Sequence, residues 1–233
     1  MKIKLKVIHN LLSFFYPRLC PSCSSPLQHH ERIICLDCQL HLPETDFHEI
    51  DNNHLEHIFA GRVSITKAAS LFSYKKGNRI QKLLHVLKYN GQYELGVFLG
   101  EYYGKILVAQ AWVSSIEMIL PIPLHPKKER QRGYNQSEAI AKGLSNSLKI
   151  PYRTDLLIKK SHTTTQTKKS RFNRWENVKD VFCVQDPDQI RGRNILICDD
   201  VLTTGATIEA AATKLFAEGS GNLFVVTLAT TQN

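Results

Sequence analysis

The stretch NILICDDVLTTGAT, residues 194–207, decides the fold. Its apolar run leads into two adjacent acids, Asp199 and Asp200, and the threonine-glycine turn that follows opens an alanine-rich segment. This pattern predicts a buried strand that ends at the acid pair and passes through a turn into a helix. An ordinary capped turn is the alternative, but capping needs one such side chain, whereas here two like charges stand side by side.

The surrounding chain alternates between strand-like and helix-like segments, which predicts an α/β fold with a mostly parallel sheet covered on both faces. Apolar runs indicate the strands, and apolar residues at helical spacing indicate the helices. The expected strands are 67–74, 118–123, 195–200 and 223–230, and the expected helices are 80–87, 94–112, 135–148 and 205–219.

The acid pair and its turn have the composition of a sugar-phosphate site. In open α/β sheets, ligands bind beyond the carboxyl ends of the strands. The unpaired N–H groups at the start of a helix can hold a phosphate, and the glycine lets the backbone approach it closely. Carboxylates accept hydrogen bonds from ribose hydroxyls and bind Mg²⁺. The predicted phosphate-binding residues are Thr203, Thr204, Gly205, Ala206 and Thr207.

Positive charge is concentrated in the middle of the chain. The net charge is +9, and residues 121–175 alone contain 13 Lys/Arg and 3 Asp/Glu. Such a field attracts phosphates of a nucleotide or of a nucleic acid, although a solvated surface is the plainer alternative. Tyr134, Phe172 and Trp175 lie among these cations, so their rings either stack on single-stranded DNA or pack against the domain. The expected phosphate-binding cations, on a loop between a strand and a helix, are Lys127, Lys128, Arg130 and Arg132.

Four cysteines form two CxxC pairs, which is the spacing of a structural zinc site. His29 and His30 lie between the pairs and could replace a thiolate, although four thiolates fit the pattern better. The spacing suits a small two-stranded ribbon, and Cys183 and Cys198 are expected in strands as small core residues. The predicted zinc ligands are Cys20, Cys23, Cys35 and Cys38.

The cysteine usage favours a cytoplasmic protein, and no apolar run reaches the roughly 20 residues of a membrane span. We expect residues 1–45 to hold a short amphipathic helix and the zinc ribbon, and residues 61–233 to form the α/β domain. The polar segment 44–57 between them has the composition of a linker or an irregular loop.

Residues 194–207 resemble the phosphoribosyl-pyrophosphate (PRPP) signature of type I phosphoribosyltransferases. The chain also resembles the ComF (competence protein F, or GntX-like) family over nearly its whole length, from about Leu11 to Thr230. Lys169 stands where that family usually has an apolar residue. The residues that carry this second resemblance are Pro121, Pro123, Leu124, Arg130, Arg132, Gly133, Tyr134, Asn135 and Gln136, followed by Gln166, Arg174 and Asn177.

The resemblance implies a type I phosphoribosyltransferase-like, Rossmann-like parallel sheet flanked by helices, with a small N-terminal zinc ribbon. Asp199 and Asp200 would be the catalytic acids that hold PRPP or ribose phosphate with Mg²⁺, while Gln166, Arg174 and Asn177 would lie on a flexible loop. It also implies a role in DNA uptake and natural competence, with single-stranded DNA and a helicase as partners. An active phosphoribosyltransferase acting on an unknown base, and a zinc-ribbon adaptor with an inactive pocket, remain alternatives.

Overall fold

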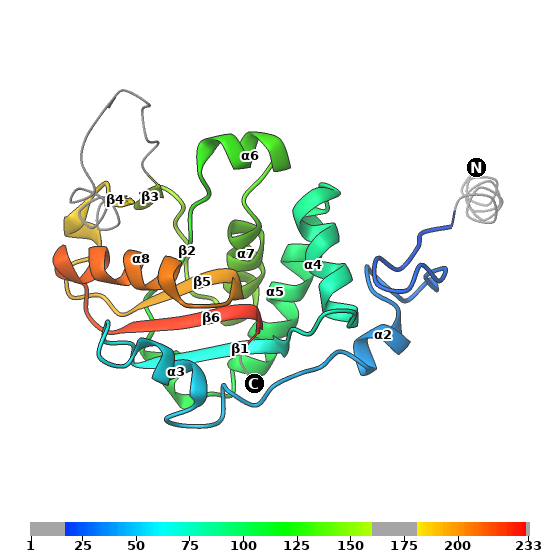
Figure 1. Cartoon of the computed structure of the whole chain (residues 1–233), viewed down its shortest axis with the longest axis horizontal. Helices are drawn as coiled ribbons and strands as arrows, with labels where there is room; N and C mark the ends of the chain where they lie inside the picture. The colour runs from blue at the N-terminus through cyan, green and yellow to red at the C-terminus, as the bar shows by residue number, and fades with distance from the viewer. Residues whose placement is uncertain (1–16, 160–180, 232–233) are drawn as a thin grey trace.

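The computed structural model describes residues 17–159 and 181–231, and within them the predicted parallel sheet is present (Figure 1). All three strand pairings in this sheet are parallel. The order across the sheet is β1 (Lys67–Ser73), β6 (Leu223–Thr230), β5 (Ile195–Leu202) and β2 (Met118–Pro121).

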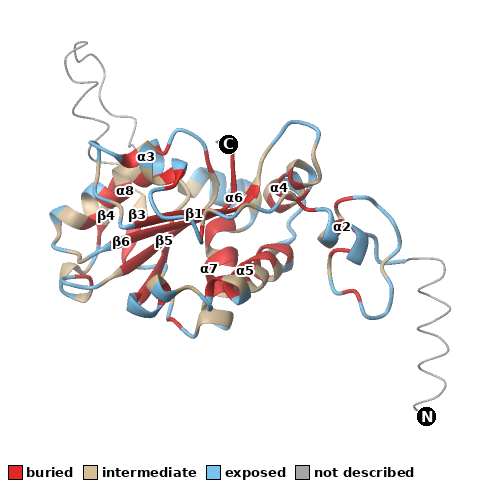
Figure 2. Cartoon of the chain, turned by 90° about the horizontal axis from the view of Figure 1, so that it is seen from below, coloured by how far each residue is buried: buried red, intermediate tan, exposed pale blue. Residues whose placement is uncertain are grey.

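Two buried clusters, one on each face of the sheet, form the core. Alternate residues of β5 supply them: Leu196 and Cys198 belong to one cluster, and Ile195 and Ile197 to the other. Figure 2 shows buried residues concentrated in the strands and on the inner sides of the helices. The first face is covered by α4 (Arg79–Tyr89), α5 (Tyr93–Leu107) and α7 (Gln136–Leu148), and the second by α3 (His54–Phe59) and α8 (Ala206–Ala217).

Helices α5 and α7 pack against each other through glycines. A Cβ atom on Gly143 would lie 2.1 Å from the carbonyl oxygen of Val97, and one on Gly100 would lie 2.2 Å from that of Ile140. Because the backbones approach this closely, α7 is held in a fixed position over β5. Helix α5 ends at Leu107, earlier than expected, and a 3₁₀ turn (Ala111–Ser115) follows it.

A short antiparallel pair, β3 (Leu157–Lys159) and β4 (Phe182–Val184), lies outside the main sheet. Cys183 is in a strand, as expected, but it is only partly buried, whereas Cys198 is fully buried. None of the described helices is long and apolar enough to cross a membrane.

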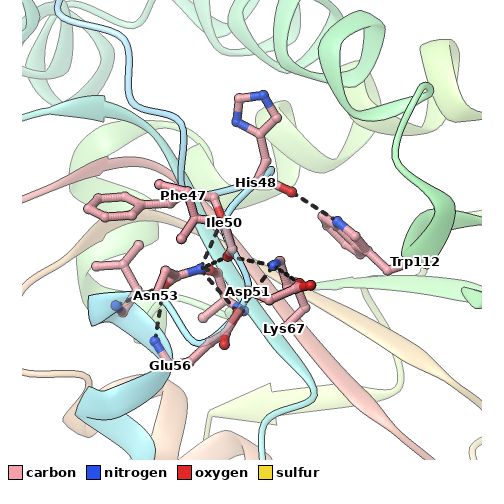
Figure 3. Close-up of polar contacts among 10 residues, drawn as sticks. Phe47, His48, Ile50, Asp51, Asn53, Glu56, Lys67 and Trp112 are labelled. Carbon is pink, nitrogen blue, oxygen red and sulfur yellow. Dashed lines mark hydrogen bonds and ion pairs between the residues drawn. The ribbon is translucent and has the colours of Figure 1, made fainter.

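The segment 44–57, expected to be a linker or an irregular loop, is irregular as far as Asn53, but it is fastened to the sheet and its last residues belong to a helix. Glu44 forms an antiparallel bridge with Phe72 of β1, and α3 begins at His54. Figure 3 shows the cluster that holds the segment: the Asn53 amide donates to Ala68 O at 2.9 Å, and the buried Lys67 ammonium donates to Ile50 O at 2.6 Å.

The N-terminal unit is one antiparallel bridge, Leu19 with Pro26, followed by the short helix α2 (Leu36–Leu40). It is therefore not the two-stranded ribbon that we expected. Arg79 of α4 pairs with Asp37 of this unit at 2.8 Å, and Ile34 belongs to the same buried cluster as α4 and α5. The amphipathic helix expected within residues 1–16 lies outside the described residues.

Candidate phosphoribosyl-binding site

The two acids lie inside β5 rather than at its end, because the strand continues to Leu202, where it pairs with Thr230. Asp199 and Asp200 are adjacent in sequence but are held by different elements, as their contacts show. Because each acid has its own partner, two like charges can be neighbours in a folded strand.

Asp199 is held by hydrogen bonds at the start of α7. Its Oδ1 accepts from the Ser137 hydroxyl at 2.8 Å and from the Asp200 amide at 2.8 Å. Burial, and next the charge of Asp200, raise the pKa of Asp199 to about 7. A carboxyl group with this pKa exists in both protonation states near neutral pH.

Asp200 is paired with a cation from the other half of the chain. The Lys88 ammonium on α4 lies 3.0 Å from Asp200 Oδ2, and both side chains are largely buried. Among the described residues, Asp199 Oδ2 and Asp200 Oδ1 form no hydrogen bond or ion pair, so they are free to accept from a ligand. Lys88 and Ser137 were missed at the sequence level, because nothing local distinguishes them from other helix residues.

The predicted phosphate turn is open to solvent on one side and packed on the other. Thr203, Thr204, Ala206 and Thr207 are exposed around a shallow hollow of about 30 Å³. Gly205 is buried and has φ +77°, in the left-handed region, and a Cβ on it would lie 2.9 Å from side-chain carbons of Ile58 and Phe59 of α3. The backbone path and the packing therefore both require glycine here.

Arg62 contacts this turn and the helix after it, and it too was not identified from the sequence. Its guanidinium donates to Thr204 O at 3.1 Å and forms an ion pair with Glu209. Glu209 lies in the first turn of α8, where its negative charge would repel a docked phosphate. The ion pair offsets that charge.

The basic residues expected on a loop form a helix, α6 (Pro126–Arg132), so the loop expectation is wrong. His125 caps it by accepting the Lys127 amide at 3.2 Å. Lys127, Lys128 and Arg130 are exposed.

Lys159 of β3 lies within electrostatic range of both α6 and Asp199. Burial is the main cause that lowers the pKa of Lys159, the nearby charge of Lys128 lowers it further, and Asp199 opposes both. The Arg132 side chain is only partly exposed. Its guanidinium donates to Gln136 at 2.6 Å and lies over the Tyr89 ring, 5.8 Å from the ring centroid.

Tyr134 packs within the domain, the plainer of its two alternatives, and its hydroxyl donates to Leu87 O. The other aromatic and loop residues singled out in the basic region lie outside the described residues. They are Gln166, Lys169, Phe172, Arg174, Trp175 and Asn177.

The four CxxC sulfurs come together as the spacing indicates. Their Sγ atoms lie within 4.8 Å of one another, and three of the four residues are buried. Thiolates around a tetrahedral zinc ion lie about 3.8 Å apart, given a Zn–S distance of about 2.3 Å. The Cys38 amide donates to Cys35 Sγ at 3.4 Å, as second-shell donors do at such centres. The cluster can bind a metal such as zinc.

Comparison with known proteins agrees with this geometry. The phosphoribosyl transferase domain family matches residues 135–231. Competence protein F of Haemophilus influenzae is 34% identical over 93 residues, which are 40% of this chain and 41% of that protein. DNA utilization protein YhgH of Shigella flexneri is 27% identical over 149 residues, 63% of this chain and 65% of that protein.

Competence protein ComFC of Bacillus subtilis is 24% identical over 204 residues, 86% of this chain and 72% of that protein. The chain thus spans less than two thirds of the length of the Haemophilus influenzae and Shigella flexneri proteins. The fold and the domain match define a phosphoribosyltransferase-like protein. Together with these relatives, they support a ComF-family protein.

The raised pKa of Asp199 makes a prediction about stability. Ionising this carboxyl group costs the folded state free energy, and the cost is absent below the ordinary pKa of 3.8 and complete above about 7. Asp199→Asn removes the charge and keeps an oxygen for Ser137. We expect the variant to melt at a higher temperature than the parent at about pH 8, with the gain shrinking toward about pH 4.

Differential scanning calorimetry at several pH values measures this gain. Asp188→Asn, which changes an exposed acid paired with Arg191, is the control and should show no growth of the difference with pH. A gain for Asp199→Asn that is constant with pH, or largest in acid, would contradict the raised pKa.

Proposed function

We propose that this protein binds PRPP or ribose 5-phosphate, together with Mg²⁺, and acts in DNA uptake. The observation that carries the proposal is the exposed turn at the start of α8 beside an acid pair in which two carboxylate oxygens have no partner among the described residues. The 5′-phosphate would lie against Thr203–Thr207, and the ribose hydroxyls against Asp199 and Asp200. The free oxygens are hard ligands of the kind Mg²⁺ prefers.

The cations of α6 complete the proposed site. Lys127, Lys128, Arg130 and Arg132 would attract the pyrophosphate of PRPP, and Mg²⁺, when bound, would offset its negative charge. Such preorganised cations would also stabilise pyrophosphate as a leaving group, so transfer of the phosphoribosyl group to a base is the alternative activity. Release of pyrophosphate from PRPP in the presence of candidate bases distinguishes transfer from binding.

Thr207→Ala tests the phosphate position. Removing one hydroxyl donor to a charged phosphate costs about 1.5–3 kcal/mol, so we expect ribose 5-phosphate to bind at least about tenfold more weakly. Isothermal titration with Mg²⁺ present measures the affinity. Thr213→Ala, an exposed threonine further along α8, should leave it unchanged.

Two outcomes would contradict the position of the ligand. One is an equal loss of affinity in both threonine variants. The other is a parent protein that binds neither ribose 5-phosphate nor PRPP at millimolar concentration, which would favour the zinc-ribbon adaptor with an inactive pocket.

We propose that single-stranded DNA contacts α6, in a cytoplasmic protein that works with a DNA-uptake helicase. The names of the relatives refer to competence and DNA utilization, and α6 exposes three cations beside the candidate site. Electrostatic attraction to phosphates does not depend on base sequence, and it weakens with salt.

Replacing Lys127 and Arg130 together by Met should weaken binding of a labelled thymidine oligonucleotide. Loss of two phosphate contacts on a single strand should reduce the slope of log affinity against log salt by about 1.4. Fluorescence anisotropy at several salt concentrations measures the slope. The control changes Arg191 and Arg193, exposed residues just before β5. If the control pair reduces the slope equally, DNA does not bind specifically at α6.

We propose that zinc fills the four-cysteine cluster and stabilises the N-terminal unit. Folding free energies of structural zinc sites are on the order of 10 kcal/mol, so the metal would hold this small unit together. Cys38→Ser should lose bound zinc and the protection of Arg18 and Arg32 peptide bonds from trypsin, whereas Cys183→Ser should keep both. Metal analysis and limited proteolysis measure the two effects. Equal zinc content in Cys38→Ser and the parent would exclude this cluster.

A further inference from the structure

One exposed aromatic ring lies on α4, the helix whose lysine pairs with Asp200. Tyr89, the last residue of α4, is 61% exposed, and it directly follows the lysine that pairs with Asp200. Among the described residues, it is the one aromatic side chain in the set of exposed large apolar groups. Leu83, Leu84 and Leu87 of the same helix are buried in the core, so the packing of α4 does not require the Tyr89 ring.

The groups around this ring suit a nucleotide. The Arg132 guanidinium lies over the ring at 5.8 Å, and His85 lies against it at a centroid distance of 4.8 Å. Arg132 is the last residue of the basic helix α6, so a cation that could bind phosphate lies beside the ring. An aromatic face bordered by Arg and Lys is the arrangement on which bases stack while phosphates pair with cations.

Other tyrosines near the site cannot offer such a face. Tyr93 and Tyr134 pack edge to face at 5.5 Å, and the Tyr134 hydroxyl is bonded to the backbone of α4. Tyr103 is fully buried. Tyr89 alone among these rings is exposed, and it directly follows Lys88 in α4.

We propose that Tyr89 is the stacking residue of a nucleobase subsite, with Arg132 bordering the ring. The ligand is a base attached to a ribose phosphate, either a free nucleotide or one residue of a single strand. The placement of its sugar near Asp200 rests on the proposed phosphoribosyl site, whereas the stacking itself does not. A base on Tyr89 would supply the recognition of a nucleobase that the phosphate turn and the acids do not provide.

The test compares Tyr89→Leu, which removes the ring, with Tyr89→Phe, which keeps it. The probes are ribose 5-phosphate, adenosine 5′-monophosphate and a labelled thymidine oligonucleotide. Stacking is worth about 1–3 kcal/mol per base, so Tyr89→Leu should weaken binding of the probes that carry a base by about tenfold. Ribose 5-phosphate should bind as before, and Tyr89→Phe should match the parent with every probe. Circular dichroism melts confirm that both variants fold.

The two sources of the base are separated by the probes. Weaker binding of both base-carrying probes assigns the subsite to nucleotides in general. Weaker binding of the mononucleotide alone assigns it to free nucleotides. A loss with the oligonucleotide alone assigns it to a strand. All three support the subsite.

The proposal is overturned if Tyr89→Leu binds both base-carrying probes as tightly as the parent does, or if the substitution weakens binding of ribose 5-phosphate by the same factor. It is also overturned if the parent binds neither base-carrying probe. A parent that binds neither ribose 5-phosphate nor PRPP contradicts the phosphoribosyl proposal. The contrast between Leu and Phe with the oligonucleotide still decides the stacking role.

Discussion

The backbone pairing of β5 is the constraint on which the site depends. β5 pairs with β2 on one side as far as Cys198 and with β6 on the other side as far as Leu202, so the pairing with β6 fixes its register past the acid pair. The two neighbouring carboxylates are held there, despite their mutual repulsion, by partners from two helices on the same face of the sheet, Ser137 of α7 and Lys88 of α4. Repulsion and burial still act on them, and they raise the pKa of Asp199. The sheet therefore supplies the geometry, and the helices packed on it supply the compensating groups.

Those compensating groups come from both halves of the chain. Ser137 lies within the matched domain, residues 135–231, but Lys88, Tyr89 and Arg62 all precede it. The described part of the candidate site thus combines the phosphoribosyltransferase-like core with residues from the preceding segment. A cation already placed on Asp200 lowers the negative charge that a phosphorylated ligand must approach. The next residue of α4, Tyr89, adds an exposed aromatic ring.

Much of this architecture could be predicted from the sequence, because strands, helices and the glycine turn leave local signals. The parallel sheet and the cysteine cluster follow from periodicity and spacing. Helix α6 was also readable, since Pro126 at its start and Gly133 in the left-handed conformation after its end are standard boundary signals. Lys88 and Arg62 could not be found this way. Their contacts join residues more than 100 positions apart, and neither stands in a distinctive motif.

The segment before β1 shapes the phosphate turn as directly as the turn's own residues do. Ile58 and Phe59 lie where a side chain on Gly205 would project, and Arg62 holds the carbonyl of Thr204. The position of α3 is set in turn by Asn53, which caps it and donates to β1, and by the buried Lys67, which holds the preceding loop. A close-packed contact of this kind transmits small displacements rather than absorbing them. A shift of α3 would therefore change how the amides of the turn face a phosphate, although no residue of α3 needs to touch the ligand.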